Sequence, residues 1–197
     1  MLPRIHPMRL RLVKEPFNNP DYIFELKHDG FRAVTYIQNG ECKILSRNSR
    51  VLRFPSLSKD LSSLRLEDAI IDGEIIHIDA NGISRFNDLL RNRSRAVLYA
   101  FDLLWLDGDD LRQQPLLDRK KRLEKLVRTI GLRLMYAQHV EGEGKDLFLE
   151  ICRNDLEGVV AKRKMGIYKD GGNSWVKIKN PTYSQAEGRR ELFFPVR

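Results

Sequence analysis

The sequence has few cysteines and no long apolar run, and each absence excludes a class of protein. Its two cysteines, Cys42 and Cys152, lie far apart in apolar segments, so neither a disulfide framework nor a four-cysteine zinc site is predicted. Residues 1–17 mix prolines with basic side chains and contain no seven-residue apolar run, so no signal peptide or membrane span is predicted. We therefore expect a soluble protein of the reducing cytoplasm with no membrane partner.

What the sequence does contain is an excess of positive charge. Its 197 residues include 35 Lys and Arg against 27 Asp and Glu, which gives a net charge of +8. This balance favours a polyanionic partner such as nucleic acid or a nucleotide, although a basic enzyme with no such partner has the same composition. The length suits one large domain or two small ones, and one is the simpler interpretation.

Alternating apolar residues and tight-turn signals predict an α+β fold with mainly antiparallel sheets. Asp29-Gly30 and Asn39-Gly40 separate three alternating segments, which predicts an antiparallel meander of residues 22–27, 31–38 and 41–46. Further strands are expected at residues 69–78, 96–106, 134–140, 158–163 and 175–179. Helices are expected at residues 115–131 and 145–153, and a short one after Pro55.

Six short motifs follow one another along the chain. The first, Lys27-His28-Asp29-Gly30, places a lysine at the end of a predicted strand; alone, this motif fits an exposed hairpin lysine better than a catalytic one. The other five are Ser46-Arg47-Asn48, Asp72-Gly73-Glu74, Tyr99 to Asp102, Glu157 to Lys162 and Trp175 to Lys179. In order and spacing, the series resembles the signature motifs of the covalent nucleotidyltransferases, which are DNA ligases, RNA ligases and mRNA capping enzymes. The stretch Phe101 to Gly108 is most similar to ATP-dependent DNA ligases.

This resemblance, over about residues 20–180, implies an ATP-grasp-like nucleotidyltransferase domain with two mainly antiparallel sheets and flanking helices. The domain is expected to span residues 1–180. Residues 181–197 would form a C-terminal tail that packs on the core, because the apolar run 192–196 would otherwise be exposed. The tail is too short for the OB-fold domain that family DNA ligases usually add.

The resemblance also implies a reaction. Lys27 would attack the α-phosphate of ATP to form a covalent lysyl-AMP, AMP would pass to a 5′-phosphate, and the neighbouring 3′-hydroxyl would seal the nick. The attacking amine must be unprotonated, whereas lysine has an ordinary pKa of about 10.4. Nearby positive charge would disfavour the ammonium and neutralise the triphosphate. The side chains predicted to supply it are Arg32, Lys162, Lys177 and Lys179.

The same resemblance implies which residues contact the phosphates and the metal ion. Lys162 and Lys177 should contact the α-phosphate, and Lys179 should assist as charge develops there or on pyrophosphate. Glu157, with Asp29, would hold Mg²⁺ or Mn²⁺, because Mg²⁺ takes only one or two protein carboxylates and shares phosphate oxygens.

The nucleoside end and the DNA are assigned in the same way. Arg32 and Glu74 would bind the ribose, Phe101 would stack on the adenine, and Glu25 would lie beside the base. Arg47 would receive the 5′-phosphate of the nick through its guanidinium. The expected partner is nicked duplex DNA, with RNA possible, bound by a monomer.

Several residues have a plainer interpretation. Phe101 could be a core residue of its apolar strand. We expect Asp72 and Asp102 to order strands or turns through hydrogen bonds, a role that fits them better than catalysis. Trp175 is expected to be a packing residue. For the whole chain, the alternatives are an RNA ligase, a GTP-using capping enzyme, or a basic module that binds nucleic acid without catalysis.

Overall fold

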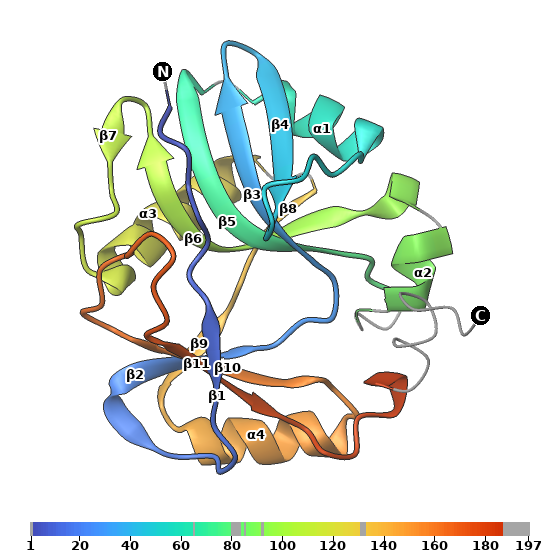
Figure 1. Ribbon diagram of the computed structural model, residues 1–197, viewed down its shortest axis with the longest axis vertical. Coiled ribbons are helices and arrows are strands. Elements are labelled where there is room, and N and C mark those ends of the chain that lie inside the picture. The colour runs from blue at the N-terminus through green and yellow to red at the C-terminus, as the bar shows by residue number, and fades with distance from the viewer. Residues whose placement is uncertain are drawn as a thin grey trace.

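The computed structural model describes residues 2–64, 66–79, 84, 86–91, 93–130 and 133–186. Two sheets dominate it, the lower and the upper in Figure 1. The lower sheet has five strands in the order β1-β11-β10-β2-β9. Their bounds are Leu10–Leu12 (β1), Trp175–Lys179 (β11), Gly158–Arg163 (β10), Asn19–Leu26 (β2) and His139–Gly142 (β9). Helix α4, Gly144–Arg153, packs on the outer face of this sheet.

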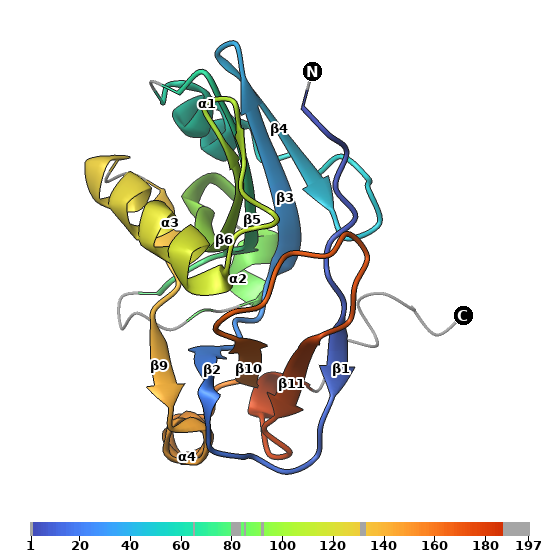
Figure 2. The same cartoon turned by 90° about the vertical axis from the view of Figure 1, so that its left-hand side faces the viewer.

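The upper sheet has six strands, ordered β4-β3-β5-β6-β7 with β8 beside β6. Their bounds are Glu41–Ser46 (β4), Phe31–Gln38 (β3), Asp68–Ile76 (β5), Val97–Leu106 (β6), Asp109–Asp110 (β7) and Leu134–Tyr136 (β8). One face packs against helices α1, Pro55–Ser62, and α3, Leu116–Ile130 (Figure 2). The shorter helical elements are α2 (Phe86–Arg91), η1 (Arg93–Arg95) and η2 (Ser184–Ala186).

The predicted fold class is confirmed. Except for β1 with β11 and β6 with β8, which are parallel, the described strand pairs are antiparallel. In the lower sheet, alternate residues point to opposite faces. Phe24, Val159 and Val176 therefore pack with α4, while the residues between them face the upper sheet.

The predicted three-stranded meander is wrong at its first turn. Strand β2 pairs with β10 and β9, and residues 27–30 cross from the lower sheet to the upper one. The Lys27 amide donates to Gly158 O at 2.8 Å, which keeps the start of the crossing on the lower sheet. A Cβ on Gly30 would lie 2.2 Å from Ile75 O, so glycine lets the chain pass close to β5. Asp-Gly here signals a change of direction, not a hairpin.

A second crossing divides the strand predicted at residues 134–140. Its first part is β8 in the upper sheet, and its last part begins β9 in the lower one. The helices predicted at α1, α3 and α4 and the strands predicted at β5, β6, β10 and β11 are confirmed. Residues 187–197, which include most of the predicted tail, lie outside the described residues. Within the described residues, no helix is both long and apolar enough to cross a membrane.

Candidate nucleotide-binding and catalytic site

A pocket lies between the two sheets and is lined by the residues that face inward from each. In the lower sheet, Glu25 of β2 lies opposite Val160 of β10, and Val160 lies opposite Lys177 of β11. In the upper sheet it joins Arg32 to Glu74, and Glu74 to Tyr99. The pocket lining includes Glu25, Lys27, Val160, Lys162 and Trp175 from below, and Arg32, Glu74, Tyr99 and Phe101 from above.

Lys27 lies where the chain leaves the lower sheet. Its Nζ is 2.7 Å from Glu157 Oε2, and the two side chains are 17% and 6% exposed. Lys27 borders the pocket between the sheets and also a smaller hollow shared with Asp29, Glu157 and Tyr183. The crossing between sheets thus directs its amine into the space between them.

Of the four residues predicted to supply positive charge around Lys27, Lys177 lies near enough for its charge to interact with that of Lys27, and Lys179 lies beside Lys177, whereas Lys162 pairs with Glu25 and Arg32 with Asp72. Lys177 and Lys179 are two residues apart on β11 and therefore share the inward face. Burial lowers the pKa of Lys177, and the charges of Lys179 and Lys27 lower it further. Arg47, exposed after β4, contributes to the same pKa shift but does not line the pocket.

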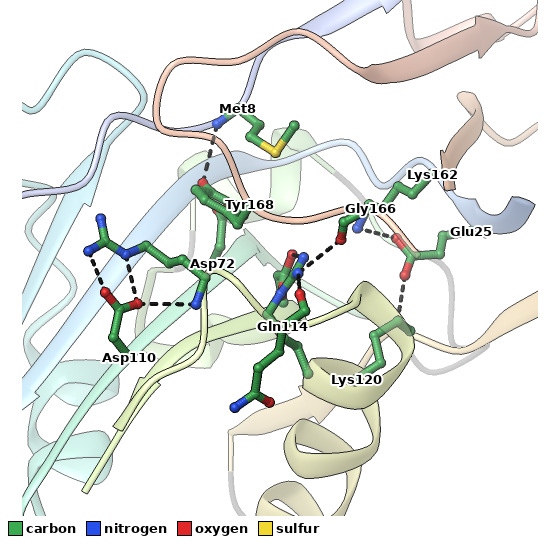
Figure 3. A network of polar contacts seen from close by, with 12 residues as sticks. Met8, Glu25, Asp72, Asp110, Gln114, Lys120, Lys162, Gly166 and Tyr168 are labelled. Atoms are coloured by element: carbon green, nitrogen blue, oxygen red, sulfur yellow. Dashed lines mark hydrogen bonds and ion pairs between the residues drawn. The ribbon is translucent and has the colours of Figure 1, made fainter. Parts of the chain in front are cut away.

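At the other end of the pocket, the carboxylate of Glu25 lies between two lysines (Figure 3). Lys120 Nζ is 2.5 Å from one oxygen and Lys162 Nζ is 2.6 Å from the other. Burial alone would raise the pKa of Glu25, but the two ammonium groups lower it. Lys162 also lies 4.2 Å from the centroids of the Phe101 and Trp175 rings, and burial lowers its pKa to about 8. The ion-pair partner of Lys162 is therefore Glu25, and its ring neighbours are Phe101 and Trp175.

Arg32 is held beside this group by Asp72. Arg32 Nε and Nη2 donate to the two Asp72 oxygens at 2.6 and 2.7 Å, and Tyr168 donates its hydroxyl to the same carboxylate at 2.7 Å. The guanidinium carbon lies 4.6 Å from the Phe101 centroid. The predicted hydrogen-bonding role of Asp72 is confirmed, and Phe101 contributes its ring to the pocket wall.

Two titratable side chains of the wall are shifted strongly by burial. Burial raises the pKa of Glu74 to about 7 and lowers that of His28 to about 4. The His28 ring lies 4.0 Å from that of Tyr99, and neither ring nitrogen has a hydrogen-bond partner among the described residues. Both groups are therefore largely neutral when they meet a ligand at slightly acidic pH.

The Glu74→Gln variant should gain stability over the wild type at about pH 8 and lose that advantage near pH 4.5. A carboxyl whose folded pKa is raised costs stability as the pH rises from its unfolded value through the folded one. With a folded pKa of about 7, the cost is up to roughly 3 kcal/mol above that pH. Urea unfolding at both pH values measures it, with the exposed Glu15→Gln as control. Parallel pH profiles for wild type and Glu74→Gln would contradict the assignment.

The predicted metal carboxylates are near each other but make different contacts. Glu157 pairs with Lys27, whereas Asp29 is buried and accepts a hydrogen bond from the Tyr183 hydroxyl at 3.1 Å. In the described part of the chain, no three His, Cys, Asp or Glu side chains gather as a metal site. A Mg²⁺ ion that shares phosphate oxygens needs only one or two of them, so Glu157 fits such an ion.

Sequence reasoning missed Arg119 and Lys120, although a signal for them exists. The apolar face of α3 includes Leu116 and Leu123, and helical spacing puts both basic residues on that face. Both are buried, and each meets a buried carboxylate: Arg119 with Asp102, and Lys120 with Glu25. Charges on an apolar helix face thus indicate buried ionic partners.

This two-sheet fold with a lysine-rich pocket between the sheets is that of a nucleotidyltransferase. The family model described as the ATP-dependent DNA ligase domain matches residues 7–179, and the chain belongs to that family.

Curated relatives agree with this assignment. The chain is 33% identical over 184 residues to the multifunctional non-homologous end joining protein LigD of Pseudomonas aeruginosa, covering 89% of the chain and 22% of that protein. It is 28% identical to the SPbeta prophage-derived DNA ligase-like protein LigB of Bacillus subtilis, covering 92% of the chain and 69% of LigB. The chain thus spans about a fifth of the LigD proteins.

Solved structures give the same picture. Mycobacterial DNA ligase D complexed with ATP and MES matches with a TM-score of 0.77 at 30% identity, covering 89% of this chain and 60% of that one. The ligase domain of Mycobacterium tuberculosis LigD matches with a TM-score of 0.75 at 29% identity, covering 89% and 59%.

Proposed function

We propose that Lys27 forms a covalent lysyl-AMP and that the chain passes this AMP to the 5′-phosphate of a DNA nick, which the 3′-hydroxyl then seals. The observation that carries the proposal is the position of Lys27, which lines a pocket between two sheets, pairs with Glu157 and lies near enough to Lys177 for their charges to interact. Such a pocket suits a nucleotide whose phosphates point towards the lysines.

The first step needs Lys27 to leave its ion pair. An ammonium has no lone pair, so contact with Glu157 must be broken and the proton lost before Nζ can bond to the α-phosphorus. Pyrophosphate leaves as the bond from the α-phosphorus to its bridging oxygen breaks. Lys177 and Lys179 would stabilise the charge that develops on these oxygens.

Glu157, with Asp29 nearby, would hold the Mg²⁺ or Mn²⁺ ion of the reaction. When bound, the ion would neutralise negative charge on the phosphates. In that arrangement Glu157 would bind the metal and no longer pair with the Lys27 ammonium. The amine of Lys27 would then be available to the nucleotide.

The opposite end of the pocket would bind the nucleoside. Phe101 would stack on the adenine, with Glu74 and Arg32 on the ribose. Lys162 is assigned here to the base, in place of the α-phosphate role that the family resemblance implied, because its ammonium contacts Glu25. A carboxylate acceptor next to an ammonium donor matches the amino group and N1 of adenine.

Nicked duplex DNA is the proposed substrate, with Arg47 binding its 5′-phosphate. A gel assay on a nicked DNA duplex, with and without a pre-formed 5′-adenylate, tests this, and a matched RNA nick is the comparison. We expect sealing of the DNA nick with ATP, and faster sealing of the adenylylated nick. Preferential sealing of RNA would favour an RNA ligase, and no sealing of either DNA would contradict the proposal.

A further inference from the structure

His28 lies in the crossing between the two sheets and lines the pocket. The Lys27 amide, bonded to Gly158 O, fixes one end of this crossing, and the close approach of Gly30 to β5 fixes the other. Both ring nitrogens of His28 are buried, and neither has a hydrogen-bond partner among the described residues. The backbone on either side therefore holds this ring in the pocket wall, without hydrogen bonds from the ring itself.

Buried nitrogens without a partner are rare, because each one costs free energy that a hydrogen bond would recover. In its neutral form the His28 ring has one N–H donor and one acceptor nitrogen. Since no described protein group bonds to either nitrogen, the partner has to be a molecule that occupies the pocket. Solvent can serve when no nucleotide is bound, and a nucleotide that enters must replace it. The unpaired ring thus points to a contact with the ligand.

The neighbours of His28 indicate which part of the nucleotide it contacts. The centroid of its ring lies 4.0 Å from that of Tyr99. Tyr99 lies opposite Glu74 where β5 pairs with β6, and both side chains line the pocket. Glu74 is assigned to the ribose in the proposed function. A ribose hydroxyl both donates and accepts hydrogen bonds, so it complements a neutral imidazole whichever nitrogen faces it.

We propose that His28 hydrogen-bonds a ribose hydroxyl of the bound nucleotide and so helps the site to select ribonucleotides over deoxyribonucleotides. The inference rests on the proposed function, in which the ribose lies beside Glu74. The family resemblance gives roles to Lys27 and Asp29, on either side of His28, but none to His28 itself. Its assignment comes from its two unpaired nitrogens and from its place beside Tyr99.

The test measures covalent adduct formation by the full chain from ATP, 2′-deoxy-ATP and 3′-deoxy-ATP. His28→Phe keeps an aromatic ring beside Tyr99 and removes both nitrogens. The ATP concentration that gives half the maximal rate should rise roughly three- to tenfold, the usual effect of losing one hydrogen bond, while the maximal rate stays unchanged. With the deoxynucleotide that lacks the contacted hydroxyl, His28→Phe should have no effect, because the contact is already absent.

A matched control makes the same substitution away from the pocket. His6 is 62% exposed and is not part of the pocket lining, so His6→Phe should behave as the wild type with all three nucleotides. An equal rise with all three for His28→Phe would show a merely structural role and would overturn this inference. If His28→Phe does not fold, His28→Leu also removes both nitrogens, and the same pattern is expected. A wild-type chain that forms no adduct would instead contradict the proposed function.

Discussion

Lys27→Ala should form no covalent AMP adduct after incubation with ATP and a divalent metal ion. Lys27 is the lysine that the crossing between the sheets directs into the pocket, with Glu157 at 2.7 Å and the β11 lysines beside it. Loss of the amine removes the nucleophile, and no remaining side chain reproduces its position. Intact-protein mass spectrometry measures the adduct, and the exposed Lys59→Ala should form it at the wild-type rate.

A second measurement on Lys27→Ala separates loss of the nucleophile from damage to the site. Sealing of a nick that already has a 5′-adenylate needs no lysyl-AMP, so the variant should retain a large part of that activity. If Lys27→Ala still formed an adduct, the nucleophile would be another lysine of the cluster, with Lys177 and Lys179 as the first candidates.

Arg119→Met should lower the free energy of unfolding by about 3–5 kcal/mol, the usual cost of breaking a buried ion pair on one side. Arg119 and Asp102 are both fully buried, and Arg119 Nε and Nη2 donate to the two carboxylate oxygens at 2.7 Å. Arg119 Nη1 also donates to Gln114 O at 2.6 Å and Gly166 O at 3.1 Å. Without the guanidinium, a carboxylate and two carbonyl groups lose their donors in the core.

Urea unfolding measures the effect, and α3 offers a matched control. Arg122 pairs with Asp109 at 2.9 Å on the same helix, but these side chains are 36% and 64% exposed. Exposed pairs contribute less than about 1 kcal/mol, so Arg122→Met should change stability little. Similar losses for Arg119→Met and Arg122→Met would contradict the structural role of the buried pair.

Most elements could be predicted from the sequence because their signals are local. Apolar runs predicted β5, β6, β10 and β11, and the apolar face predicted α3. Strand pairing was not predictable in the same way, because it depends on residues far apart in the chain. Asp29-Gly30 has the composition of a hairpin turn, yet it connects two sheets, since β10 and β9 are the neighbours of β2.

The candidate site shows the same division. The motifs identified the residue types that line the pocket, including Glu25, Lys27, Glu74 and Phe101. They did not predict the contact of Lys162 with Glu25, nor the position of Lys120 behind it. Motif spacing specifies which residues share a site, whereas side-chain packing decides which of them touch.

The crossing at residues 27–30 has a consequence for synthesis of the protein. Lys27 leaves the ribosome early, but β2 finds its neighbours only in β9 and β10, and Lys177 and Lys179 arrive with β11, last among the described strands. Pairing between segments separated by most of the chain is slow and costs loop-closure entropy. A growing chain therefore holds Lys27, the proposed nucleophile, without its pocket until translation has passed β11, and binding of ATP by the nascent chain should begin only then.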